Sequence, residues 1–240
     1  MNPLAWAGRW FFASAMVVLG IQNLVYQGML KGLQVTPEWL PAHVFWAYLM
    51  GAVLIAGGVS VALNVKAQLG ADALALLFLA SLLLLRLPRL GEAIHNTSER
   101  TVLFETIVCA CGACLLGNRG LLIARVLIGI SMIVFGVDHL LIPETIAKLI
   151  PAWMPQRVFL AWFTGIALIA AGVCIAIPLR FGDSKRLAAR LLGLMFFLWV
   201  VLLHGPRVAA HPHHPNEWNS AFVALAMCGV AWILSKKAYR

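Results

Sequence analysis

Residues 151–172 read PAWMPQRVFLAWFTGIALIAAG, and residues 37–58 read PEWLPAHVFWAYLMGAVLIAGG. Each stretch has a tryptophan between two prolines and then an apolar run with spaced glycines. Identical residues occupy aligned positions at Pro37/Pro151, Trp39/Trp153, Pro41/Pro155, Phe45/Phe159, Gly51/Gly165 and Gly58/Gly172, among others. Apolar bias alone does not place prolines and a tryptophan in register. The sequence therefore predicts an internal duplication.

The duplication extends over the rest of the chain. The segment Gly-Ile-Gln-Asn-Leu at 20–24 aligns with Gly-Val-Asp-His-Leu at 136–140, and Leu-Arg-Leu-Pro-Arg at 85–89 aligns with Leu-His-Gly-Pro-Arg at 203–207. We therefore expect two units, 1–119 and 120–240. Only a tight turn joins them, so they should pack as one body in the membrane.

The composition is that of an integral membrane protein. Hydrophobic residues make up 62% of the chain and charged residues 11%, whereas a soluble domain is about half apolar and about a quarter charged. Because about 20 helical residues cross a bilayer core, the continuous apolar runs predict eight transmembrane helices, four in each unit. The expected spans are 9–27, 43–63, 70–87, 101–117, 121–141, 157–178, 186–204 and 218–235.

An even number of spans returns the chain to its starting side, so the two units should be parallel. Lys and Arg gather on the side that holds both termini, which predicts cytoplasmic termini by the positive-inside rule. This asymmetry accounts for the net charge of +9, so nucleic acid is not an expected partner and the lipid bilayer is. The first span resembles a signal peptide, but its aligned copy lies in mid-chain, so we expect the mature protein to keep it.

On this topology all seven histidines lie on the non-cytoplasmic side or at the helix ends that face it: His43, His95, His139, His204, His211, His213 and His214. The pair Asp138-His139 is the sharpest polar feature, because an Asp near the end of a span needs a partner inside the bundle. The candidate partners are His204, Arg207 and Glu217. The pair is either a structural contact between helices or a binding and proton-handling site.

Other polar and aromatic features have two interpretations each. Trp153 either anchors a helix at the membrane interface or lines a pocket for a ring compound. The run from His211 to His214 suits a weak metal site, but no second cluster accompanies it, so we assign no metal ligands. The cysteines lie in apolar runs and are expected to pack in the core. The first unit has different polar residues at the matching places, Gln22, Asn23, Arg86, Arg89 and Glu99, which suggests a scaffold copy or sequence drift.

The second unit resembles a known family. The segments RVLIGISMIVFGVDHLLIP, PAWMP and HPNEWNSAF are similar to those of the DoxX family of bacterial membrane proteins, over about 123–235. The first unit resembles it more faintly. The resemblance implies a four-helix unit in the bacterial cytoplasmic membrane. It also implies an association with redox membrane complexes such as thiosulfate:quinone oxidoreductase, although fold does not imply function.

Three functions remain open from the sequence. The first is a redox-linked subunit that binds a quinone-like or other small ring compound near the outer face, with Asp138 and His139 handling protons, Arg207 holding an anionic oxygen and Trp153 stacking. No motif for a covalent cofactor or for a known enzyme class is present, so electrons would need a redox partner protein or the quinone itself. The second is a small-molecule or metal transporter, and the third is a non-catalytic assembly scaffold. The sequence names neither ligand nor oligomer.

Overall fold

The computed structural model describes residues 3–27, 41–177 and 184–236, and in these residues the regular structure is entirely helical. Pro37, Trp39 and the end of the expected span 157–178 lie outside the described residues. The helices are α1 (Pro3–Tyr26), α2 (His43–Leu63), α3 (Ala67–Ser81), α4 (Leu90–His95), α5 (Thr97–Leu116), α6 (Leu121–Leu141), α7 (Pro143–Leu149), α8 (Arg157–Ala176), α9 (Ser184–Trp199), α10 (Gly205–Ala210) and α11 (Pro215–Leu234). Three further short segments are η1 (Leu82–Arg86) and η3 (Val200–His204), which are π-helical, and η2 (Leu87–Arg89), which is a 3₁₀ turn.

Seven helical segments within the described residues are long and apolar enough to cross a membrane, so the chain is a multi-pass integral membrane protein. They are Pro3–Tyr26, His43–Leu63, Ala67–His95, Leu121–Leu141, Arg157–Ala176, Ser184–Ala210 and Pro215–Leu234. The expected span 101–117 folds as α5, but α5 is not among the seven. Its 20 residues carry Glu99, Arg100 and Glu105, which is more charge than a lipid-facing helix tolerates.

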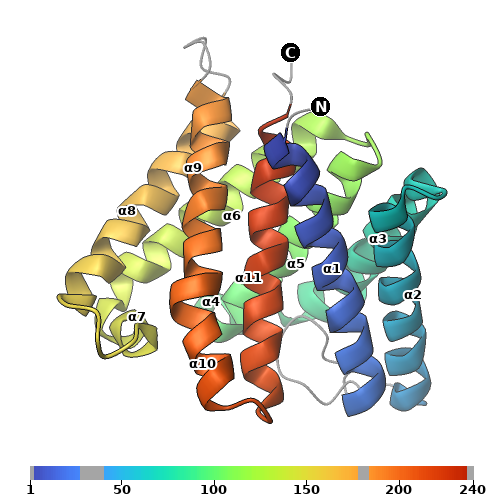
Figure 1. The fold of residues 1–240 in the computed structure, drawn as a ribbon, viewed down its shortest axis with the longest axis horizontal. Coiled ribbons are helices and arrows are strands. Elements are labelled where there is room, and N and C mark those ends of the chain that lie inside the picture. The colour runs from blue at the N-terminus through green and yellow to red at the C-terminus, as the bar shows by residue number, and fades with distance from the viewer. Residues whose placement is uncertain (1–2, 28–40, 178–183, 237–240) are drawn as a thin grey trace.

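The helices form one bundle, with α1, α5 and α11 in the middle, α2 and α3 on one flank and α8 and α9 on the other (Figure 1). Within it, α1 packs on α2 and α11, while α6 packs on α8 and α5. The helix α1, which is the first of residues 1–119, thus contacts α11, the last long helix of residues 120–240. In the same way α6, the first helix of residues 120–240, contacts α5, the last long helix of residues 1–119. The helices α5 and α11 also contact each other.

Glycines bring α1 against α2, and α6 against α8, at backbone distance. A Cβ atom added to Gly20 would lie 2.7 Å from the carbonyl oxygen of Gly51 and 2.7 Å from Cγ1 of Ile55. A Cβ atom added to Gly136 would lie 2.5 Å from the carbonyl oxygen of Gly165 and 2.6 Å from Cγ1 of Ile169. The sequence aligns these residues pair by pair, and their contacts are equivalent. Such small-residue contacts allow helices in lipid to approach closely.

The two π-helical segments also occupy aligned positions. The segment η1 ends at Arg86 and η3 ends at His204, and a proline follows each of them, Pro88 or Pro206. A π-helical turn widens the helix by one residue and is frequent at functional sites. Both expected spans here, 70–87 and 186–204, continue as short helices, α4 and α10, that the apolar pattern did not predict.

The bundle has two distinct ends. The start of α1, the end of α11 and the turn before α6 lie at one end, which we call the terminal end (Figure 1). At the other end lie the start of α2, the end of α6, the helices α4, α7 and α10, and with them all seven histidines. We call it the histidine end.

The glycine contact predicts a matched pair of variants. Gly136→Ala places a methyl group against the backbone of α8, and we expect a loss of about 1–3 kcal/mol in unfolding free energy from overpacking. Gly91→Ala in α4 has no atom within 4 Å of the new Cβ and should leave stability equal or slightly higher. Thermal unfolding of the detergent-solubilised protein measures both. Equal melting temperatures for the two variants would contradict the contact.

Candidate functional site

Asp138, on α6, is bound by a residue that the sequence interpretation did not consider. Arg100, in the first turns of α5, donates from Nε to both carboxylate oxygens of Asp138, at 2.9 and 3.1 Å, and from Nη2 to Oδ1 at 2.5 Å. The two side chains are 20% and 7% exposed, respectively. The predicted partners His204, Arg207 and Glu217 make no such contact with Asp138, so that part of the prediction was wrong. Both carboxylate oxygens of Asp138 are engaged in a bidentate ion pair.

Arg100 joins three helices through its guanidinium group. Beyond Asp138, its Nη1 donates to the carbonyl oxygens of Ala93 and Ile94 at the end of α4, both at 3.1 Å, and its Nη2 donates to the hydroxyl of Thr97 at 3.1 Å. The five N–H groups of an arginine are its full donor capacity, and these contacts use all three nitrogens. Arg100 therefore holds α4, α5 and α6 together at the histidine end.

The ring of His139 has a defined tautomer and a defined neighbour. Its Nδ1 lies 2.8 Å from the carbonyl oxygen of Phe135. A carbonyl only accepts, so Nδ1 carries the proton, and in the neutral ring Nε2 carries the lone pair. The ring stacks on Trp199 of α9, with centroids 5.8 Å apart and planes at 13°. His139 thus has a free acceptor atom, Nε2, on a ring that is stacked against Trp199.

The π-helical segment η3 brings His204 towards the same face of its helix as Trp199. In a π-helix the N–H of residue i+5 bonds to the carbonyl of residue i, as Gly205 N–H does to Val200. Two residues that are five positions apart, such as Trp199 and His204, therefore lie on the same face, one turn from each other. The Nδ1 atom of His204 is buried and has no hydrogen-bond partner within the described residues. A buried polar atom of this kind calls for a partner that a ligand or water can supply.

Of the remaining predicted site residues, Arg207 and Glu217 pair with each other. Arg207 Nη2 donates to Oε1 of Glu217 at 3.0 Å, and its Nε lies 2.8 Å from Oε2. His204 lies within electrostatic range of both. Trp153, in the connection between α7 and α8, is 64% exposed and is not part of this cluster.

Within residues 3–27, 41–177 and 184–236, no group of three or more His, Cys, Asp or Glu side chains could hold a metal ion. His211, His213 and His214 are exposed in the turn before α11. Cys109, Cys111 and Cys228 are buried and Cys114 and Cys174 are partly buried, all as free thiols.

The first half has a different polar interior at the aligned positions. Asn23 aligns with His139 and Ser81 with Trp199, and they are 1% and 7% exposed. The amide nitrogen and oxygen of Asn23 and the hydroxyl of Ser81 have no hydrogen-bond partner among the described residues. Arg86, which η1 brings towards the face of Ser81, is buried and lies within electrostatic range of Glu99 and Glu105.

The sequence interpretation missed Arg100, Trp199 and Glu105. Arg100 lies one residue before the expected span 101–117 and therefore outside the predicted helices. Trp199 sits in an apolar run and has no distinguishing signal. Glu105 does have a signal, since it is a carboxyl group inside an expected span, and such residues are functional candidates by default.

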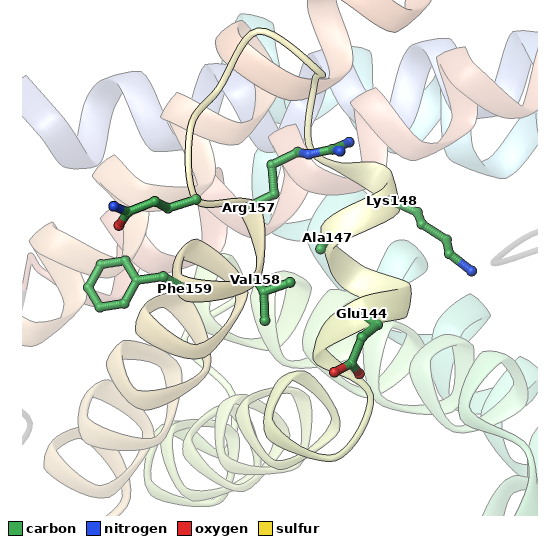
Figure 2. A pocket seen from close by; sticks show the side chains of 7 residues that line it. Glu144, Ala147, Lys148, Arg157, Val158 and Phe159 are labelled. Atoms are coloured by element: carbon green, nitrogen blue, oxygen red, sulfur yellow. The ribbon is translucent and has the colours of Figure 1, made fainter.

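Two pockets lie away from this cluster. One, of about 400 Å³, lies between α7 and the start of α8 and is shown in Figure 2. A second, of about 480 Å³, lies at the terminal end, where Arg9 and Asn64 are among the lining residues. None of the predicted site residues lines either pocket.

Comparison of the chain with protein-family models, with curated proteins and with solved structures finds no match.

The Arg100–Asp138 pair predicts a stability effect that depends on both partners. Asp138→Asn removes the counter-charge of the partly buried Arg100 guanidinium and should lower the unfolding free energy by about 2–3 kcal/mol. In a double-mutant cycle, the variant Arg100→Met/Asp138→Asn should lose less stability than the sum of the losses in Arg100→Met and Asp138→Asn.

The control is the exposed pair Arg119–Asp72 at the terminal end, where Asp72→Asn should change stability little because solvent screens the pair. Thermal unfolding in one detergent measures all variants. Additive losses in the cycle would show that the pair does not couple α5 to α6.

Proposed function

We propose that the chain consists of two tandem, parallel four-helix units, 1–119 and 120–240, with α5 as an eighth span. Four observations support this: the equivalent glycine contacts, the aligned π-helical segments, the reciprocal packing of α1 and α6, and the shared end from which both start. A helix of 20 residues is about 30 Å long and reaches across a bilayer core. Arg100 on α5 has its charge paired, which lowers the cost of burying it.

We further propose that the protein is a DoxX-like, redox-linked subunit of the bacterial cytoplasmic membrane, with its termini in the cytoplasm. The basic excess at the terminal end supports this orientation. Its ligand would be a quinone-like or other small ring compound that carries a hydroxyl group, bound at the histidine end. The observation that carries the proposal is the stacked pair His139–Trp199, which leaves the lone pair of His139 Nε2 as an acceptor.

The side chains present fit such a compound. The rings of His139 and Trp199 offer a flat apolar surface, and aromatic rings stack on one another with a gain of about 1 kcal/mol. Nε2 of His139 accepts a hydrogen bond from a hydroxyl. The buried Nδ1 of His204, which lacks a partner within the described residues, offers a second polar contact.

A hydroquinone bound here would supply two electrons and two protons on oxidation. His139 would take one proton on the lone pair of Nε2, and water at the histidine end would take the other. Asp138 would act by charge and position: its carboxylate stays bound to Arg100 and favours the positive charge on the neighbouring ring. Arg207, paired with Glu217, would hold an anionic oxygen only if that pair opened. Electrons would pass to a redox partner protein.

This proposal predicts that a ring compound co-purifies with the protein. His139→Phe keeps a ring against Trp199 but removes Nε2, so extraction and mass analysis should show the compound at least tenfold reduced, since losing a polar contact in a dry site costs about 1–3 kcal/mol. Trp153→Leu, which changes only an exposed ring, should retain it. A compound that stays bound in His139→Phe would refute the site. Absence of any such compound from the unaltered protein would favour an assembly scaffold.

One observation favours transport of a small polar molecule as a second candidate function. Asn23, Ser81 and Arg86 are buried in the first half, and the partly buried Glu105 lies within electrostatic range of Arg86. Ionisable residues inside a membrane bundle mark substrate and proton pathways. The first half would then be the functional unit rather than a scaffold copy.

The transport candidate predicts an effect of Glu105→Gln. Purified protein in liposomes with an acidic exterior should acidify the lumen, as measured by a trapped pH-sensitive dye, and the rate should fall at least tenfold in Glu105→Gln. Glu92→Gln, in the short helix α4 outside this interior, is the matched control and should keep the rate. Equal rates in empty liposomes and in liposomes with the unaltered protein would exclude a proton pathway through this half.

A further inference from the structure

The pocket between α7 and α8 is built from both polar and apolar side chains. Its lining residues are Glu144, Ala147, Lys148, Gln156, Arg157, Val158 and Phe159. In Figure 2, Arg157 and Glu144 lie at opposite edges of the hollow, with Ala147 and Val158 between them and Lys148 on the flank of α7. The pocket thus has separate cationic and anionic edges over an apolar floor.

The position of the pocket relative to the membrane follows from α8. Arg157 is the first residue of a candidate span, so the pocket lies where that helix leaves the apolar layer. Trp153, just before it, is 64% exposed, and exposed tryptophans are typical of the interface between lipid headgroups and tails. From the pocket, the exposed and mutually stacked rings of Phe159 and Phe163 continue along the membrane-spanning face of α8.

The charged side chains that line the pocket have no ionic partner among the described residues. Arg157, Lys148 and Glu144 are exposed, and within the described residues none of them forms an ion pair or a side-chain hydrogen bond. By contrast, Arg207 and Glu217, at the same end of the bundle, form an ion pair with each other. Arg157 and Glu144 therefore face a hollow at the membrane surface, and Lys148 lies beside it on the outer flank of α7.

We propose that this pocket binds the headgroup of a phosphoethanolamine lipid. Arg157 holds the phosphate, since arginine forms strong charge-assisted hydrogen bonds to phosphate oxygens, and Lys148 on the flank of α7 adds positive charge nearby. Glu144 accepts hydrogen bonds from the primary ammonium group. The acyl chains lie along Phe159 and Phe163. The site is independent of the redox and transport proposals.

The carboxylate of Glu144 determines which phospholipid headgroup fits the pocket best. A phosphoglycerol headgroup has a phosphate but no cation, so it leaves Glu144 unpaired beside a negative charge. A phosphocholine headgroup has a cation without an N–H donor, so it cannot donate to Glu144. Of these three headgroups, only phosphoethanolamine matches both edges of the pocket.

Native mass spectrometry of the full chain in detergent tests the proposal, by titration with ethanolamine, glycerol and choline phospholipids that have the same acyl chains. The unaltered protein should bind the ethanolamine lipid about tenfold more tightly than either other lipid, which corresponds to ~1.4 kcal/mol. Glu144→Gln should abolish this preference, and Arg157→Gln should weaken binding of all three lipids. Arg89→Gln, a partly exposed cation at the same end but outside the pocket, should change nothing.

Equal affinity for the three lipids, or an unchanged preference in Glu144→Gln, would overturn the proposal. Water-soluble phosphoethanolamine, which lacks acyl chains, distinguishes a lipid from a free phosphate compound. It should not compete with the lipid at equal concentration. Competition at equal concentration would show that the apolar face of α8 contributes nothing and would refute a lipid site.

Discussion

Close backbone contact between glycine pairs fixes the helix register on which the rest of the structure depends. Lipid provides no hydrophobic drive for helices to associate, so shape complementarity has to do so. Gly136 and Gly165 set the contact of α6 with α8, and a Cβ atom on Gly165 would lie 2.9 Å from Cβ of His139. The same contact thus directs the His139 ring across the bundle, where it meets Trp199.

Charge pairing is the second constraint, and it acts between the two halves. Asp138 belongs to the first helix after the central turn, and Arg100 to the last long helix before it. A buried carboxylate without a cation is costly in a medium of low dielectric constant. Because Arg100 also binds the end of α4, this single pair fixes three helices at the histidine end. The carboxylate of Asp138 is therefore held by Arg100, one residue before His139.

The apolar pattern predicted helices well and side-chain partners poorly. The bounds of α2 and α6 agree with the expected spans 43–63 and 121–141, because an apolar run that must satisfy its backbone in lipid has no alternative to a helix. The partner of Asp138 was wrong because the expected span began at Thr101, which left Arg100 outside the predicted helices. Asn96 caps α5 by accepting from the N–H groups of Ser98 and Glu99, so the helix begins earlier.

The π-helical segments could not be predicted, because no residue pattern distinguishes a π turn from an α turn in a run of leucines and valines. Their consequence is chemical. Each turns one polar residue, Arg86 or His204, towards the interior of its half. In the second half two aromatic rings meet in that interior. In the first half the aligned residues are Asn23 and Ser81, which fill less volume and whose side-chain polar atoms have no hydrogen-bond partner in the part of the chain that the structure describes. The helices α6 and α9 therefore contribute two stacked aromatic rings, whereas the aligned positions in α1 and α3 hold hydrogen-bonding side chains.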